Sequence, residues 1–369
     1  MMGGGARAAY QVGVLMGISR FYKKQSAIPF QIVCGTSAGA INAVALACMA
    51  GDFRNSVRRM YDVWANFRVH HVFRSDLGGI MKTGSKWLAA MMLGGMGKNN
   101  PLYLFDRAPL KKLLEKYLDF NMIGEAIAAE HLYALSVTAS GYFSGMSVTF
   151  YQGHHSITPW ERVRRVSCRQ PIHLDHLMAS SAIPYLFEPV KINREYFGDG
   201  SMRMTSPLSA AIHLGAEKIL VIGNRMEEVQ HHERVSSEYP PSFAQIAGHA
   251  LNSIFLDSLE ADLERIERIN QTLGHIEAEK FSNGTVKLKK IDTLLIAPCD
   301  DLGDLAKEYF HTLPWAIRYL LRGMGATPKK GSTMLSYLLF EKEYCRCLIR
   351  QGLQDALRQK DEVLAFLAD

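Results

Sequence analysis

The sequence predicts an α/β fold: a mainly parallel central sheet flanked by helices, followed by a helix-rich C-terminal extension. Two observations carry this prediction. Segments with helical periodicity alternate with short apolar segments over residues 1–224, which is typical of βαβ units. The segment 218–223, with the sequence Lys-Ile-Leu-Val-Ile-Gly, is almost continuously apolar and β-branched, as expected of a strand that is buried on both faces.

The expected elements follow from periodicity and from the residues that interrupt it. The segment 76–100 mixes methionines with glycines and predicts either a mobile cap that contacts an apolar ligand or a loosely patterned helix on the core. Strands are expected over residues 28–34, 132–138, 147–151, 186–192 and 218–223, and helices over residues 8–24, 38–50, 55–67 and 107–117.

The character of the chain changes near Asn224. A polar segment with two prolines follows, then a long periodic helix over residues 242–273, a strand at residues 294–296 and further helices. We therefore expect one domain over residues 1–224 and a helix-rich extension over residues 225–369. Because the late strand can join the sheet, the extension is expected to dock on the first domain.

The composition is that of an ordinary globular protein, with 48% hydrophobic and 21% charged residues among 369. A net charge of +6 is modest for a nucleic-acid-binding protein, so no nucleic acid partner is expected. The six cysteines lie mostly in apolar segments without a C-x-x-C pair, which favours a reducing, cytoplasmic setting. The sequence lacks a long uncharged apolar segment and a secretory signal, so membrane contact is expected to be peripheral, on the inner surface.

The candidate nucleophile is Ser37, which lies in the G-x-S-x-G sequence between Gly35 and Gly39. An apolar segment precedes it and a helix of small residues follows, so we expect the serine on a sharp strand–turn–helix. The two glycines suit such a turn because strand and helix approach closely there. The serine hydroxyl would then lie at the amino end of the helix, among its free N–H groups.

A glycine loop opens the chain, at Gly3-Gly4-Gly5-Ala6-Arg7-Ala8. Consecutive glycines before a helix expose several N–H groups around one point, as an oxyanion requires. The loop also fits a relaxed dinucleotide fingerprint. However, no strand precedes it in the sequence, and the acid expected about twenty residues later is missing, which disfavours that interpretation. Arg7 could orient the loop or meet an anionic head group, although a surface arginine that caps the helix is the simpler expectation.

The candidate base is Asp199, in Gly198-Asp199-Gly200. A partly buried aspartate can accept the proton of a serine. The alternative is a Ser-Asp-His triad with His213, which satisfies the chain order, although its helical spacing favours a structural role. His173 and His176 lack a second pair, so neither a metal nor another cofactor is expected.

In this order, the glycine loop, the elbow serine and the glycine-flanked acid resemble the motifs of the patatin-like phospholipases. The resemblance covers roughly residues 3–223. The segment 179–184, Ala-Ser-Ser-Ala-Ile-Pro, is similar to the family's serine-alanine-proline helix beside the active site. Three departures stand out: Ala8 replaces a glycine and would resist a positive φ angle, Ser201 replaces a smaller residue, and family members usually have a strand before the loop.

The resemblance implies a three-layer α/β/α catalytic domain over residues 1–224 and a lipid acyl hydrolase of phospholipase A or lysophospholipase type. It implies a Ser37-Asp199 dyad without histidine, acting on phospholipid or lysophospholipid at a membrane surface. A homo-oligomer is left open. The implied oxyanion-hole and motif residues are Gly3, Gly4, Gly5, Ala6 and Arg7, and Gly35, Gly39 and Gly200.

A binding module without activity is the competing hypothesis. In that case the elbow would be catalytically impaired and the C-terminal helices would bind a partner. The apolar segment 335–340, together with Tyr344, Cys345 and Leu348, would supply the contact face. Packing of these residues within the chain is the simpler expectation.

Overall fold

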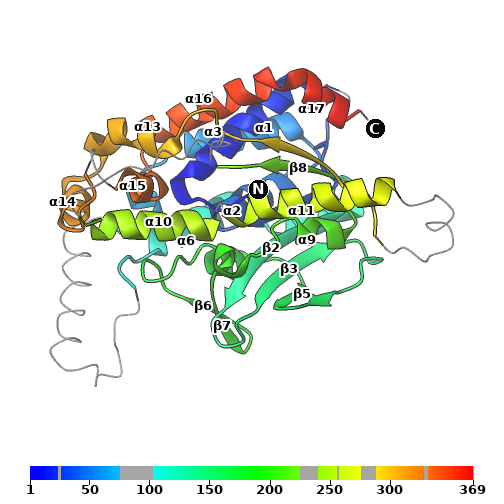
Figure 1. The fold of residues 1–369 in the computed structure, drawn as a ribbon, viewed down its shortest axis with the longest axis horizontal. Helices are drawn as coiled ribbons and strands as arrows, with labels where there is room; N and C mark the ends of the chain where they lie inside the picture. Colours follow the sequence, from blue (N-terminus) through cyan, green and yellow to red (C-terminus); the bar gives the residue numbers. More distant parts are fainter. Residues whose placement is uncertain are drawn as a thin grey trace.

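The structure, a computed structural model, describes residues 1–23, 26–74, 103–224, 240–255, 257–275, 288–327 and 331–368. The expected segment 76–100 therefore lies outside the described residues. Strands and helices alternate along the first half of the chain, and helices predominate after it (Figure 1). The strands are β1 (Ile32–Thr36), β2 (Ala134–Gly141), β3 (Ser147–Gly153), β4 (Glu161–Arg162), β5 (Arg165–Arg169), β6 (Val190–Ile192), β7 (Glu195–Asp199), β8 (Lys218–Ile222) and β9 (Asp292–Ile296).

Helices cover both sides of the strands (Figure 1). Short 3₁₀ helices lie at Gly5–Ala8, Gly200–Arg203 and Phe310–Thr312. The α-helices are α1 (Ala9–Phe21), α2 (Ala38–Ala47), α3 (Phe53–Trp64), α4 (Val69–Val72), α6 (Ala108–Tyr117), α7 (Asn121–Ala128), α8 (Leu174–Ser180), α9 (Ser209–Leu214), α10 (Phe243–Phe255), α11 (Asp257–Gly274), α13 (Leu302–Tyr309), α14 (Trp315–Gly323), α15 (Ser332–Leu338), α16 (Lys342–Arg358) and α17 (Lys360–Phe366).

The α/β fold with flanking helices is confirmed, but the expectation of a mainly parallel sheet is wrong for the larger sheet. Within it, β1–β2 and β3–β5 are parallel, whereas β2–β3, β2–β7, β4–β5 and β6–β7 are antiparallel. Short connections explain the difference: five residues join β2 to β3 and two join β6 to β7, which is too few for a crossover. The parallel arrangement holds for the separate pair β8–β9.

The late strand predicted at residues 294–296 is β9, and it pairs with β8 from the first part of the chain. The long helix predicted over residues 242–273 corresponds to α10 and α11, which lie on either side of residue 256, outside the described residues. Among the described residues, no helix has the length and apolarity that crossing a bilayer requires.

The C-terminal helices pack on the first helix of the chain. Helices α1 and α16 lie side by side (Figure 1), and the Tyr10 hydroxyl of α1 donates to Asp355 Oδ2 of α16 at 3.0 Å. The apolar residues at 335–340, 344, 345 and 348 are buried in the same core cluster as α1 and α2. They pack within the chain, and so they do not form an exposed contact face.

A cavity of about 720 Å³ separates β1 from β8, and both strands line it. Met1 lies at the edge of this cavity and pairs with β1 in the way that a residue of a parallel strand does. Its amino group donates to Cys34 O at 2.9 Å, and its carbonyl accepts from Thr36 N–H at 3.3 Å. Burial lowers the pKa of this α-amino group below its ordinary value. Apart from Met1, the described residues leave this edge of β1 without a strand partner.

Candidate active site

Ser37 lies on the predicted strand–turn–helix, between the end of β1 and the start of α2. Its backbone has φ 54° and ψ −131°, a conformation that costs a residue with a side chain about 1–3 kcal/mol. A Cβ atom at Gly35 would lie 2.6 Å from Gly39 O, and one at Gly39 would lie 2.5 Å from Met1 O. Both glycines are therefore required by close backbone approach, and they allow the strained turn that holds Ser37.

Asp199 ends β7 directly opposite this turn. The Ser37 hydroxyl donates to Asp199 Oδ2 at 2.6 Å, and the Ser201 N–H donates to Asp199 Oδ1 at 3.0 Å. Both Ser37 and Asp199 are buried, with 1% and 0% of their surface exposed. Burial raises the pKa of the Asp199 carboxyl to about 6, while hydrogen bonds from Ser37 and Ser201 and the charge of Arg107 oppose the rise. The carboxyl can therefore exchange a proton near neutral pH.

Two residues that the sequence analysis did not assign support this pair. Ser180 accepts from the Ser37 N–H at 2.9 Å and donates to Thr138 O at 2.6 Å, so it fixes the turn against β2. Arg107 is buried, donates to Met178 O and Glu188 O, both at 2.8 Å, and contributes positive charge near Asp199. Ser180 lies in segment 179–184, whose similarity to the family's serine-alanine-proline helix placed that segment beside the active site. No local sequence pattern identifies Arg107.

The glycine loop passes beside the nucleophile, since a Cβ atom at Gly3 would lie 2.9 Å from the Cβ of Ser37. The Arg7 N–H donates to Gly4 O at 3.1 Å and is thereby occupied. The hydrogen bonds within the described residues leave the N–H groups of Gly4, Gly5 and Ala6 available to an oxyanion. Ala8 has φ −63°, so the predicted obstacle of a positive φ does not arise.

Arg7 is not the surface residue that the sequence suggested: only 3% of it is exposed. Its guanidinium group points away from solvent and contacts Asn224 and α15. The reason is the position of α15 and α16, which cover the start of α1 in the fold. The local periodicity of the sequence around Arg7 does not reveal that α15 and α16 pack over this residue.

The histidine alternative finds no support in the geometry. The His213 ring stacks on Trp160, with 5.1 Å between ring centroids, and it forms no hydrogen bond with the Ser37-Asp199 pair. His173 and His176 bond to each other, because the His173 N–H donates to His176 Nδ1 at 2.9 Å at the start of α8. In the described part of the chain, no group of His, Cys, Asp or Glu has a metal-binding arrangement.

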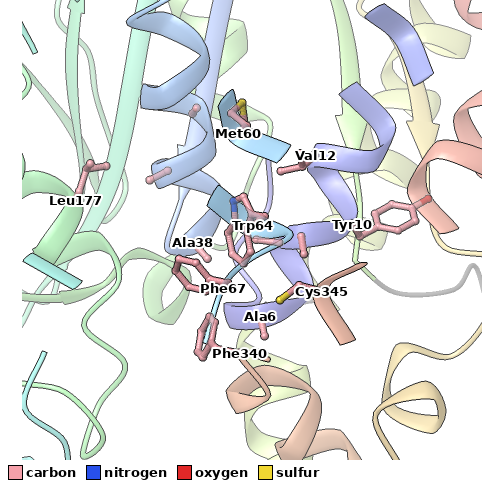
Figure 2. Packing of buried hydrophobic residues seen from close by; sticks show 14 of the residues in the cluster. Ala6, Tyr10, Val12, Ala38, Met60, Trp64, Phe67, Leu177, Phe340 and Cys345 are labelled. Carbon is pink, nitrogen blue, oxygen red and sulfur yellow. The ribbon is translucent and has the colours of Figure 1, made fainter. Parts of the chain in front are cut away.

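A largely apolar cavity of about 700 Å³ begins at Ser37 and Gly5 and continues along α2. Ile41 and Ala45 line it at intervals of one helical turn, and both are half-buried, whereas residues 42–44 of the same helix are buried. Figure 2 shows Trp64, Phe67 and Phe340 gathered beside Ala38, at the inner end of this cavity. The nucleophile candidate therefore faces a space with mainly hydrocarbon walls.

The fold and the site together place the chain in the class of α/β proteins that present a serine on a sharp strand–turn–helix. A family model described as Patatin-like phospholipase matches residues 1–212, more than half of the chain. The chain belongs to this family of lipid acyl hydrolases, and the resemblance found in the motifs is confirmed.

The chain is similar to the crystal structure of VipD from Legionella pneumophila, with 11% sequence identity and a TM-score of 0.36. The match covers 98% of this chain, which spans 66% of the length of that structure. Among curated proteins, none matches the chain.

Proposed function

We propose that the protein is a serine hydrolase of phospholipase A or lysophospholipase type that cleaves carboxylic esters of membrane lipids. Ser37 is the nucleophile and Asp199 its base. The observation that carries the proposal is the 2.6 Å hydrogen bond between their side chains, at the end of an apolar cavity. A lipid substrate also fits peripheral contact with a membrane surface, which we include in the proposal.

The proposed reaction has two acyl-transfer steps. With a pKa of about 6, Asp199 is mostly ionised at neutral pH and takes the proton of Ser37 as the hydroxyl attacks the ester carbonyl. The N–H groups of Gly4, Gly5 and Ala6 stabilise the resulting oxyanion, at ~3 kcal/mol for each donor of this kind. Asp199 then protonates the departing alcohol, and water repeats the sequence on the acyl-enzyme. Each proton that leaves an attacking oxygen is returned to a leaving oxygen.

The apolar cavity supplies a site for the acyl chain. Ala45 lies about 12 Å beyond Ser37 along α2, at 1.5 Å per residue, so a long acyl chain reaches it and a butyryl group does not. We expect Ala45→Trp to lower turnover of a palmitoyl ester by about tenfold or more, because the indole fills the distal cavity. Turnover of a butyryl ester is expected to stay within about twofold.

The measurement is kcat/KM for the two esters, with Ala45→Ser as the matched control that keeps the cavity open. An equal loss for both esters in Ala45→Trp would show that the variant damages the site as a whole. Unchanged turnover of both would place the acyl chain elsewhere.

Mass-spectrometric analysis of the products from a mixed lipid panel tests the proposed function itself. The panel contains diacyl phospholipids with several head groups, lysophospholipids, a triacylglycerol and an acyl thioester. We expect release of free fatty acid from phospholipid or lysophospholipid, with the remaining product identifying the ester position. No acyl release from any panel member would reject the proposal.

A further inference from the structure

The glycine loop is held by residues that lie outside the family-matched range 1–212. The buried guanidinium group of Arg7 donates from Nε to Ser336 Oγ at 2.8 Å and from Nη1 to Asn224 O at 3.5 Å. Its Cζ atom lies 4.2 Å from the centre of the Tyr337 ring. These partners are a hydroxyl, a carbonyl and an aromatic face, so the charge is held by neutral groups in a defined geometry.

The backbone of the loop is held by the same elements. The Asn224 side chain donates to Gly3 O, and Gly5 lies so close to the carbonyl oxygen of Tyr337 that a Cβ atom would clash with it. Gly5 has φ 55°, so a side chain is disfavoured there for two reasons. On this side the loop is therefore fixed by Asn224, which follows β8, and by α15, while its other side contacts Ser37.

A second helix supports the tyrosine. The Phe255 ring of α10 stacks on Tyr337 with 5.2 Å between centroids, and the Tyr337 hydroxyl donates to Asn252 Oδ1 at 2.9 Å. Ser336 is fixed as well, because its hydroxyl donates to Thr333 O at 2.6 Å and so directs its lone pairs to Arg7. Neither Ser336 nor Tyr337 is therefore free to reorient without breaking another contact.

We propose that Asn224, Ser336 and Tyr337 form a loop clamp, a set of positioning residues that holds the oxyanion loop at its working distance from Ser37. The C-terminal region is then part of the catalytic site and not a separate extension. This inference rests on the proposed function, since it assigns the loop to oxyanion binding. Positioning matters at this scale because a displacement of about 1 Å can cost about a hundredfold in rate.

The test compares Ser336→Ala with Ser332→Ala, two serines of α15, of which only the first contacts Arg7. We expect Ser336→Ala to lower kcat on an ester substrate and the second-order rate of fluorophosphonate labelling by about tenfold, with KM changed by less than about twofold. Ser332→Ala is expected to match the wild type. Loss of one buried hydroxyl leaves the fold intact, which a thermal melt checks.

Tyr337→Leu provides a second, independent variant, because it removes the aromatic face beneath Arg7. It is expected to give the same loss in kcat and labelling rate. If both clamp variants are labelled as fast as Ser332→Ala, the clamp is rejected while the proposed function stands. If wild-type protein neither reacts with the probe nor cleaves any ester, the proposed function fails, and the clamp fails with it. A rise in KM alone would also overturn the clamp and assign these residues to substrate binding.

Discussion

Ser37→Ala is expected to abolish both ester turnover and labelling by a fluorophosphonate probe. The probe phosphonylates a serine only where a base and an oxyanion site activate the hydroxyl, and the Ser37 hydroxyl donates to the buried Asp199 at 2.6 Å. Loss of a nucleophile of this kind lowers kcat by about 10⁴–10⁶-fold. The measurement is in-gel labelling together with fatty acid release.

Ser19→Ala is a suitable control, since its hydroxyl bonds only within α1, to Met16 O. It is expected to be labelled like the wild type. Labelling that persists in Ser37→Ala would assign the nucleophile to another serine. Wild-type protein that binds lipid but is never labelled would favour the binding module over the enzyme.

Asp199→Asn is expected to have the second largest effect, a loss of about 10²–10⁴-fold in kcat, because an amide cannot accept the serine proton. In the wild type, the requirement for an ionised Asp199 is expected to appear in the dependence of kcat/KM on pH. Since burial raises the pKa of Asp199 to about 6, kcat/KM should fall below that pH with the uptake of one proton and level off above it. His213→Ala is the matched control and is expected to keep turnover within about threefold.

The Asp199→Asn variant should also be more stable than the wild type at neutral pH. The pKa of Asp199 is about 6 in the folded protein against 3.8 in the unfolded chain, so the folded state binds the proton more tightly. Stability from this group is complete below pH 3.8 and is lost as the pH rises through about 6. The amide of the variant carries no charge, and we expect it to raise the free energy of unfolding at pH 7 on the order of 2 kcal/mol.

Thermal melts of both proteins at pH 7 and at pH 4 separate this effect from general changes in packing. The difference in stability between the two proteins should shrink strongly at pH 4, where the carboxyl group of wild-type Asp199 is protonated and therefore neutral like the amide. A variant that is less stable than the wild type at pH 7 would show that the carboxylate is stabilised in place. A carboxylate stabilised in this way would be a weaker base for the proton of Ser37.

The serine and the aspartate that the sequence proposes for the site lie together in the structure, and both were found because each belongs to a short motif. A glycine on each side of Ser37 identifies the elbow, and the glycines around Asp199 identify the end of β7. The partners of these motifs could not be found in the same way. Arg7 and Ser336 are 329 residues apart, and no local pattern relates a loop arginine to a serine in a late helix.

The direction of the strands was mispredicted for a similar reason. Alternating apolar segments indicate strands but not their order or direction, and β2 runs antiparallel to β3 because only a short turn joins them. The element types near β1, α2, α3 and β8 agree with the prediction, with boundaries shifted by a few residues. The prediction that Arg7 is exposed failed because burial there depends on elements that follow it by more than 200 residues.

The cavity between β1 and β8 affects how the protein should be handled. A strand edge without a neighbouring strand is a template for any extended peptide, and among the described residues two such edges border one cavity. An extended segment inserted there can pair with backbone groups of both strands, which stabilises it more than pairing with a single edge. We therefore expect concentrated protein to self-associate through the cavity between β1 and β8. Activity and stability are better measured in dilute samples.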